Sequence, residues 1–145
     1  MNIIFDIDGV LADNRHRRSL IEAPPKDWDT YYDRMGADPV IQPVADIMAT
    51  MAMTNNIFLC TGRPTQYRQR TNNWLKAAEL WDHVYRMFMR PEGDRRPNPD
   101  LKRDMAEAIT MEYGPIYMVF EDDPRSVKVW KEYAHTVLEV SHVGL

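Results

Sequence analysis

The chain begins with a short apolar strand that runs directly into two aspartates, in the sequence NIIFDIDGVL at residues 2–11. Gly9 permits a tight turn immediately after Asp8. Two carboxylates as close as Asp6 and Asp8 push their pKa values apart, so that one can remain ionised while the other holds a proton. A carboxylate nucleophile with a neighbouring general acid and base needs such a pair. The alternative is that the two aspartates only cap a turn.

Short apolar segments alternate with longer stretches of helical spacing along the rest of the chain. The segments with the length and composition of buried strands are 2–6, 56–60, 83–87, 116–120 and 136–140. Apolar residues at helical spacing occupy 41–53 and 64–80. This alternation predicts an α/β fold with a five-stranded, mainly parallel sheet and helices on both faces, in a single domain over residues 1–145.

Two further helix starts are marked by a capping side chain followed by proline. Asn98 precedes Pro99, and Asp123 precedes Pro124. Residues 13–39 are less regular. We expect them to form a small cap-like excursion from the sheet, with one or two short helices.

Polar side chains follow the second predicted strand, in the tripeptide Thr61-Gly62-Arg63. Ligands of open parallel sheets bind at the carboxyl ends of the strands. A hydroxyl, an unhindered backbone and a guanidinium at a strand-to-helix junction suit a phosphate group. Capping of the helix expected from residue 64 is an equally good explanation of this tripeptide.

Carboxylates follow the fourth predicted strand, at Asp122 and Asp123. With Asp6 they offer three acidic side chains to a hard cation, and oxygen ligands favour Mg²⁺. Asp123 has a competing role as the cap before Pro124, so Asp122 is the preferred ligand.

Lys102 falls in the first turn of the helix expected from residue 98, where a cation opposes the helix dipole. Neutralising an aspartate cluster and a bound phosphate would explain this placement. The net charge is −4 over residues 1–60, +5 over 61–103 and −5 over 104–145. A positive central third between acidic flanks suits a metal ion meeting an anionic substrate. Three solvated surfaces are the alternative.

Composition excludes several classes of protein. The 145 residues carry a net charge of −4 and are 44% hydrophobic and 28% charged, which is typical of a globular chain. No apolar run approaches the roughly 20 residues of a membrane-spanning helix, and acidic residues near the N-terminus argue against a secretory signal. The single cysteine, Cys60, rules out a disulfide framework. We expect a cytoplasmic protein with no membrane partner and no stable protein partner.

Four motifs follow one another along nearly the whole chain: Asp6-x-Asp8, Thr61-Gly62-Arg63, Lys102 and Asp122-Asp123. In this order they resemble the haloacid dehalogenase (HAD) superfamily of phosphotransferases. Residues 90–102 and 122–130 are more narrowly similar to the phosphatase domain of phage-type polynucleotide kinase/phosphatases. That family usually has an aspartate four residues before its motif lysine, where this chain has Asn98; Asp100 is the alternative. The 145 residues contain no GxxxxGK[ST] loop, so we expect them to contain no kinase half.

The resemblance implies a Rossmann-like HAD fold with a minimal cap and an Mg²⁺-dependent phosphatase mechanism. Asp6 would form an aspartyl-phosphate, and Asp8 would serve as general acid and base. The other roles that it implies are phosphoryl binding by Thr61 and Lys102, substrate binding by Arg17, Gly62 and Arg63, and Mg²⁺ binding by Asp6, the backbone carbonyl of Asp8, Asp122 and Asp123.

The small excursion predicts an open site that suits a bulky substrate such as a nucleic-acid end. Trp28, Tyr31 and Tyr32 lie on the excursion and could stack on bases or simply pack a small helix. The resemblance favours terminal 3′-phosphates of nucleotides or polynucleotides. A phosphatase of mononucleotides or other small phosphoesters, and a catalytically idle binding module with the HAD fold, are the alternatives.

Overall fold

A computed structural model describes residues 1–141. Its centre is one sheet in the order β3-β2-β1-β4-β5, in which every neighbouring pair of strands is parallel. The strands are β1 (Asn2–Phe5), β2 (Asn56–Pro64), β3 (Arg86–Arg90), β4 (Ile116–Glu121) and β5 (Ala134–Glu139). The predicted five-stranded parallel sheet is confirmed. The strand order reverses beside β1, so the carboxyl ends of β1, β2 and β4 meet at the switch point where open sheets bind ligands.

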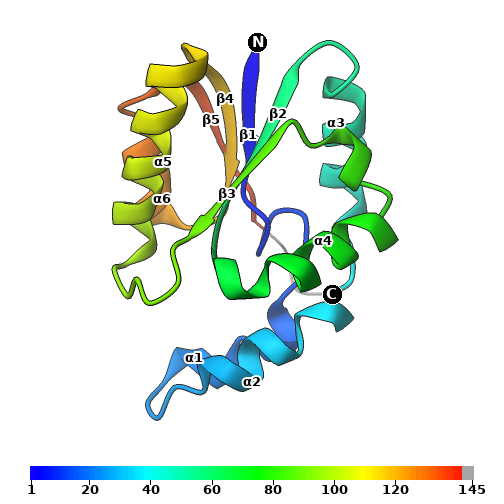
Figure 1. The fold of residues 1–145 in the computed structure, drawn as a ribbon, viewed down its shortest axis with the longest axis vertical. Helices are drawn as coiled ribbons and strands as arrows, with labels where there is room; N and C mark the ends of the chain where they lie inside the picture. Colours follow the sequence, from blue (N-terminus) through cyan, green and yellow to red (C-terminus); the bar gives the residue numbers. More distant parts are fainter. Residues whose placement is uncertain (142–145) are drawn as a thin grey trace.

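Helices cover both faces of the sheet (Figure 1). On one face lie α3 (Gln42–Met51) and α4 (Arg68–Ala77), and on the other α5 (Asn98–Tyr113) and α6 (Pro124–Trp130). Successive residues of β1 point to opposite faces, so Ile3 packs with the α3 side and Ile4 with the α5 side. No helix within residues 1–141 is long and apolar enough to cross a membrane.

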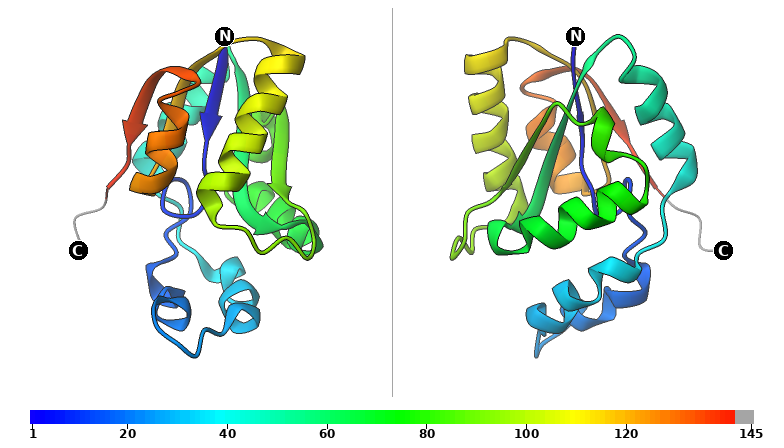
Figure 2. Two further views of the ribbon diagram at one scale, coloured as in Figure 1. Left: turned by 90° about the vertical axis from the view of Figure 1, so that its left-hand side faces the viewer. Right: turned by 45° about the vertical axis from the view of Figure 1, so that its right-hand side comes forward.

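Residues 13–39 form the excursion that the sequence predicts. It contains two short helices, α1 (Ser19–Glu22) and α2 (Trp28–Asp33), and 3₁₀ turns at Arg15–Arg17 and Met35–Ala37. Both views in Figure 2 place this segment beyond the carboxyl ends of the strands, below the edge of the sheet. It therefore lies on the side of the sheet where the site is expected.

Several predicted boundaries are wrong. The fifth strand is Ala134–Glu139 rather than 136–140. The third strand is Arg86–Arg90 rather than 83–87, because Trp81–His83 forms a 3₁₀ turn before the chain joins the sheet. The helix expected from residue 64 begins at Arg68, because β2 continues through Pro64 and a 3₁₀ turn follows. The tripeptide Thr61-Gly62-Arg63 therefore extends a strand and does not open a helix.

The two predicted helix caps have different outcomes. The Asp123 side chain accepts a hydrogen bond from the backbone amide of Arg125 at 3.0 Å and caps α6, as predicted. Asn98 does not cap α5, because Pro97 occupies the cap position and the Asn98 side chain accepts a 2.6 Å hydrogen bond from Arg90.

Candidate active site

The turn after β1 carries Asp6 and Asp8 to the edge of the sheet. The carbonyl of Ile7 accepts backbone hydrogen bonds from the next residues, including those from Leu11 at 2.8 Å and Ala12 at 2.9 Å. Gly9 has a φ of +82°, and a Cβ at this position would overlap the carboxylate of Asp122. Glycine is therefore required here by the backbone of the turn and also by the close approach of Asp122, the residue directly after β4.

Three carboxylates from two strands meet beside this turn. Oxygens of Asp6, Glu121 and Asp122 all lie within 4.8 Å of one another. Burial, followed by the charge of Glu121, raises the pKa of Asp6 well above its usual value, although Lys102 opposes this. The same two causes raise the pKa of Asp122 to about 7. Because a nucleophilic carboxylate must be ionised, this cluster needs more positive charge than Lys102 supplies, which fits a divalent cation.

Lys102 is buried and reaches the cluster from α5. Its Nζ donates to Glu121 Oε2 at 2.8 Å and to the carbonyl of Cys60 at 3.0 Å. It also lies 3.2 Å from Oδ1 of Asp6. Burial alone would lower the pKa of Lys102, but the nearby carboxylates raise it, so the side chain is charged.

Glu121 is a buried residue of the site to which sequence reasoning gave no role. Its Oε2 also accepts from Trp130 Nε1 at 3.1 Å, and its Oε1 accepts from the backbone amides of Asp122 and Asp123 at 3.1 and 3.3 Å. Burial would raise its pKa, but Lys102 outweighs burial and lowers it to about 2. With four donors on two oxygens, Glu121 orients its neighbours, and Asp6 and Asp122 are better suited to hold a cation.

Asp8 is held by the two arginines that the resemblance assigns to the substrate. Its Oδ1 accepts from Arg17 at 2.7 Å and from Arg63 at 2.8 Å, and its Oδ2 accepts from Arg63 Nε at 3.1 Å. Burial would raise the pKa of Asp8, but Arg63 and Arg17 bring it below its usual value. Both arginine side chains are fully buried. In this structure they lie behind Asp8, away from open solvent.

Asp38 completes this buried network from the end of the excursion. Its carboxylate accepts from Arg17 at 2.6 and 2.8 Å and from Arg63 at 3.5 Å, and it lies 2.6 Å from His16 Nε2. Sequence analysis did not find Asp38, since an isolated aspartate in an irregular segment carries no spacing signal.

A cleft with a volume of about 350 Å³ opens between the sheet edge and the excursion. Asp6, Asp8, Asp122 and Asp123 line it. Its volume lies in the range of roughly 300–1,000 Å³ that is usual for ligand pockets. The predicted acidic residues are therefore together at one open cavity.

The residues of the tripeptide at the end of β2 do not all line the cleft. Gly62 lines it, and a Cβ there would overlap the side chain of Asn98, which lines it too. Thr61 is fully buried, and its hydroxyl accepts from the backbone amide of Arg63 at 3.1 Å. Asp100, the alternative to Asn98, is exposed on α5.

Asp123 lines the cleft but has a structural task as well. In addition to capping α6, its carboxylate pairs with Arg125 at 3.1 Å. The described cluster of three carboxylates contains Glu121 in the place where the sequence suggested Asp123.

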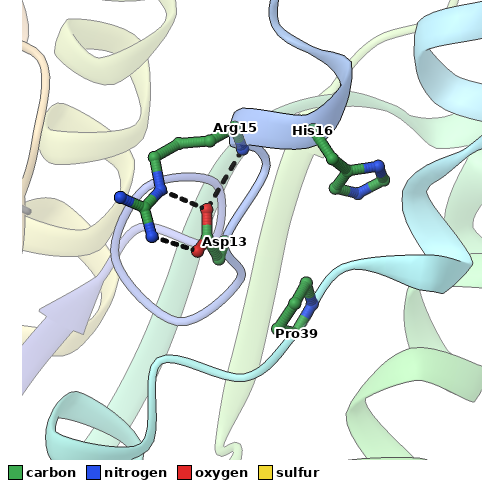
Figure 3. A pocket seen from close by; sticks show the side chains of 4 residues that line it. All are labelled: Asp13, Arg15, His16 and Pro39. Atoms are coloured by element: carbon green, nitrogen blue, oxygen red, sulfur yellow. Dashed lines mark hydrogen bonds and ion pairs between the residues drawn. The ribbon is translucent and has the colours of Figure 1, made fainter. Parts of the chain in front are cut away.

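A second hollow, of about 400 Å³, lies on the excursion (Figure 3). It is lined by Asp13, Arg15, His16 and Pro39. Arg15 donates to both carboxylate oxygens of Asp13, at 2.9 and 2.7 Å. The lining residues include none of those predicted for the site, so the cleft at Asp6 is the candidate active site.

Comparison with solved structures shows which class of proteins has this fold. The fold is similar to that of one chain in the structure of the Pnkp1/Rnl/Hen1 complex, with 18% identity, a TM-score of 0.74, and coverage of 99% of this chain and 47% of that one. A class C acid phosphatase from Bacillus anthracis with tungstate bound has 13% identity, a TM-score of 0.67, and coverage of 86% and 52%. The HAD-hydrolase YfnB from Bacillus subtilis bound to magnesium has 11% identity, a TM-score of 0.64, and coverage of 90% and 82%. The fold is thus that of HAD hydrolases. No curated protein sequence matches the chain.

The amino-acid sequence assigns the chain to one family within this class. Residues 1–144 match the family described as the polynucleotide kinase PNKP phosphatase domain. The chain belongs to this family. It spans less than half the length of the chain that it matches in the Pnkp1/Rnl/Hen1 complex.

Proposed function

We propose that this protein is an Mg²⁺-dependent phosphomonoesterase that acts through an aspartyl-phosphate on terminal 3′-phosphates of polynucleotides or nucleotides. The observation that carries the proposal is the position of Asp6. Its carboxylate lines an open cleft, lies 3.2 Å from the buried ammonium group of Lys102, and stands beside Asp122.

Asp6 and Asp122 would hold the magnesium ion, with the backbone carbonyl of Asp8 and with Asp123 in the roles that the family resemblance implies. The raised pKa values of Asp6 and Asp122 support this, because a cation would remove the repulsion that contributes to them. When bound, the ion supplies neutralisation of charge on the phosphoryl oxygens.

The reaction proceeds in two displacements at phosphorus. A carboxylate oxygen of Asp6 bonds to phosphorus as the ester P–O bond breaks, and Asp8 gives a proton to the departing oxygen. Asp8 then removes a proton from water, whose oxygen bonds to phosphorus as the bond to Asp6 breaks. Inorganic phosphate leaves and both aspartates are restored. Lys102 and Thr61 hold phosphoryl oxygens, since phosphoryl transfer depends mainly on positioning and charge neutralisation.

The acid role of Asp8 requires a change at Arg17 and Arg63. While both arginines contact Asp8, its pKa is low and it rests as a carboxylate. We propose that they turn toward the incoming phosphate. Burial then dominates at Asp8 and favours its protonated form. Binding of the substrate would thus itself cause the protonation of Asp8, the general acid.

The family and the open cleft support a 3′-phosphate end of a nucleic acid as substrate. A free mononucleotide is the second candidate. Salt distinguishes them, because a polynucleotide that contacts the protein through several phosphates binds much more weakly as salt rises. A reducing cytoplasm remains the expected setting. An idle binding module is less well supported, since each acid, base and charge-neutralising position is filled by a residue that the chemistry can use.

The test is phosphate release from 3′- and 5′-phosphorylated oligonucleotides and a 3′-mononucleotide, with Mg²⁺ or with EDTA. We expect activity on 3′-phosphates with Mg²⁺ and near-complete loss in Asp6→Asn. Asp82→Asn, which alters an exposed aspartate near β3, is the control and should retain activity. Full activity in Asp6→Asn would eliminate the nucleophile, and equal rates on all substrates would remove the preference for 3′-ends.

A further inference from the structure

The aromatic residues of the excursion divide into two kinds. Tyr31 and Tyr32 are 5% and 8% exposed and form a small core with Met35. Trp28, one turn earlier on α2, is 45% exposed. Packing therefore accounts for the two tyrosines but leaves much of the tryptophan surface in water, where it costs free energy.

The indole ring of Trp28 is nevertheless held in place. It stacks on Tyr32 with ring centroids 5.9 Å apart and an interplanar angle of 25°, and it meets Tyr31 edge-on at 5.6 Å. Tyr32 stacks in turn on Tyr67, at 4.7 Å, from the segment before α4. The ring of Trp28 thus ends a row of stacked aromatic side chains that is anchored on the sheet domain.

Trp28 lines the same cleft as the acidic residues. Asp6, Asp8 and Asp122 follow strands of the sheet, whereas Trp28 begins α2 of the excursion, and all four line this cavity. A ligand with a phosphate at Asp6 and a planar ring on Trp28 would extend across the cleft. Its volume of about 350 Å³ has room for a group of the size of a nucleotide.

Cationic side chains line the cleft through which such a ligand would extend. Arg18 and Arg125 both line the cleft, and their side chains are 50% and 68% exposed. The contact between Arg18 and Glu22 is long, at 3.7 Å. Exposed pairs of this kind contribute little to stability, so these arginines can exchange partners for phosphates at low cost.

We propose that Trp28 is the stacking platform for the nucleobase of the terminal nucleotide, in a subsite on the excursion side of the cleft. This rests on the proposed function, because it takes the phosphate of that nucleotide to be at Asp6. Stacking on one aromatic face tolerates every base, so the subsite selects nucleotides over other phosphoesters without selecting a sequence. The nucleotide is either free or at the end of a strand.

Kinetics test the subsite with paired substrates. One oligonucleotide carries a 3′-phosphate on a normal terminal nucleotide, and the other carries it on an abasic terminal sugar. We expect Trp28→Ala to reduce kcat/KM for the first by about 5- to 30-fold, to leave the second nearly unchanged, and Trp28→Phe to restore much of the loss. Trp81→Ala, which removes another exposed tryptophan, is the control. Equal losses on both substrates would overturn the inference.

Binding gives a readout that does not need turnover. In an Asp6→Asn background, the 3′-phosphorylated oligonucleotide should quench tryptophan fluorescence, and Trp28→Phe should remove most of that quenching. Quenching by the 3′-mononucleotide as well would show that the subsite also takes free nucleotides, whereas quenching by the strand alone assigns it to strand ends. Unchanged quenching in Trp28→Phe would overturn the inference. Quenching without phosphate release in the unmodified protein would instead remove the proposed function and keep the subsite.

Discussion

The Nζ of Lys102 lies 2.8 Å from Oε2 of Glu121, and both side chains are almost completely buried. This pair crosses from α5 to the end of β4. Since Lys102 also lies 3.2 Å from Asp6, Glu121 fixes the position of the lysine beside Asp6. A buried pair of this kind is costly to break, because the remaining charge is left without a partner.

Glu121→Gln tests this pairing. We expect a loss of about 3 kcal/mol in the free energy of unfolding, measured by urea denaturation, together with reduced phosphate release. Glu132→Gln is the matched control, because Glu132 pairs with Arg103 at 2.7 Å on the exposed surface. The control should change stability by less than about 1 kcal/mol. Similar losses in the two variants would contradict the assigned role of Glu121.

The acidic cluster predicts the pH dependence of the metal-free protein. Asp122 has a pKa of about 7 in the fold, and the pKa of Asp6 is also raised, so the folded state binds these protons more tightly than the unfolded chain. The metal-free protein should therefore lose stability as the pH rises from about 5 to about 8. Thermal melts in EDTA measure this, and Asp122→Asn should flatten the slope. A slope unaffected by Asp122→Asn would argue against the assignment.

Magnesium should stabilise the protein most at the pH values at which Asp6 and Asp122 have lost their protons. We expect added Mg²⁺ to raise the melting temperature more at pH 8 than at pH 5, since the ion must displace protons from Asp6 and Asp122 at the lower pH. Melts with a titration of Mg²⁺ measure the effect, and EDTA should reverse it. An equal response in Asp122→Asn would show that the ion binds elsewhere.

Gly9 and Gly93 offer a comparison between two glycines of nearly equal backbone geometry. Their φ angles are +82° and +83°, but a Cβ at Gly9 would overlap Asp122, whereas none of the described atoms lies within 4 Å of a Cβ at Gly93. Alanine should cost about 1 kcal/mol or more of backbone strain at either position. Only Gly9→Ala should also abolish the Mg²⁺-dependent rise in melting temperature. Retention of that rise would show that Asp122 can move without consequence.

Asp38→Asn tests the network around Asp8. The carboxylate of Asp38 is fully buried against Arg17, so its removal should lower the free energy of unfolding by about 3 kcal/mol or more and reduce kcat. Asp33→Asn, which affects an exposed pair with Arg70 at 2.7 Å, should leave both nearly unchanged. Unchanged kcat in Asp38→Asn would exclude Asp38 as a positioning residue.

Much of this fold can be predicted from the sequence, because strands and helix starts depend on patterns of a few neighbouring residues. The apolar residues of β1 and the proline after Asp123 each give a signal within a short window, and both predictions are confirmed. The third strand was misplaced because Val84 and Tyr85 are apolar without belonging to it. Asn98 does not cap α5, because its side chain accepts a hydrogen bond from Arg90, which lies outside the helix.

The residues that sequence reasoning missed are those whose role depends on contacts between distant segments. Asp38 meets arginines 21 and 25 positions away, and Glu121 meets a lysine 19 positions away. No spacing rule connects such positions. One signal was available for Glu121, as a third acid directly beside Asp122 and Asp123 at the end of an apolar strand.

The order of the strands also determines when the acidic cluster can form during synthesis. β1 lies between β2 and β4, so it can gain its second neighbour only once residues 116–121 have been synthesised. The acidic cluster joins Asp6 to two side chains that come more than a hundred residues later, Glu121 and Asp122. A chain interrupted before β4 would therefore contain Asp6 and Lys102 without these two carboxylates, and the proposed magnesium site could not form in it.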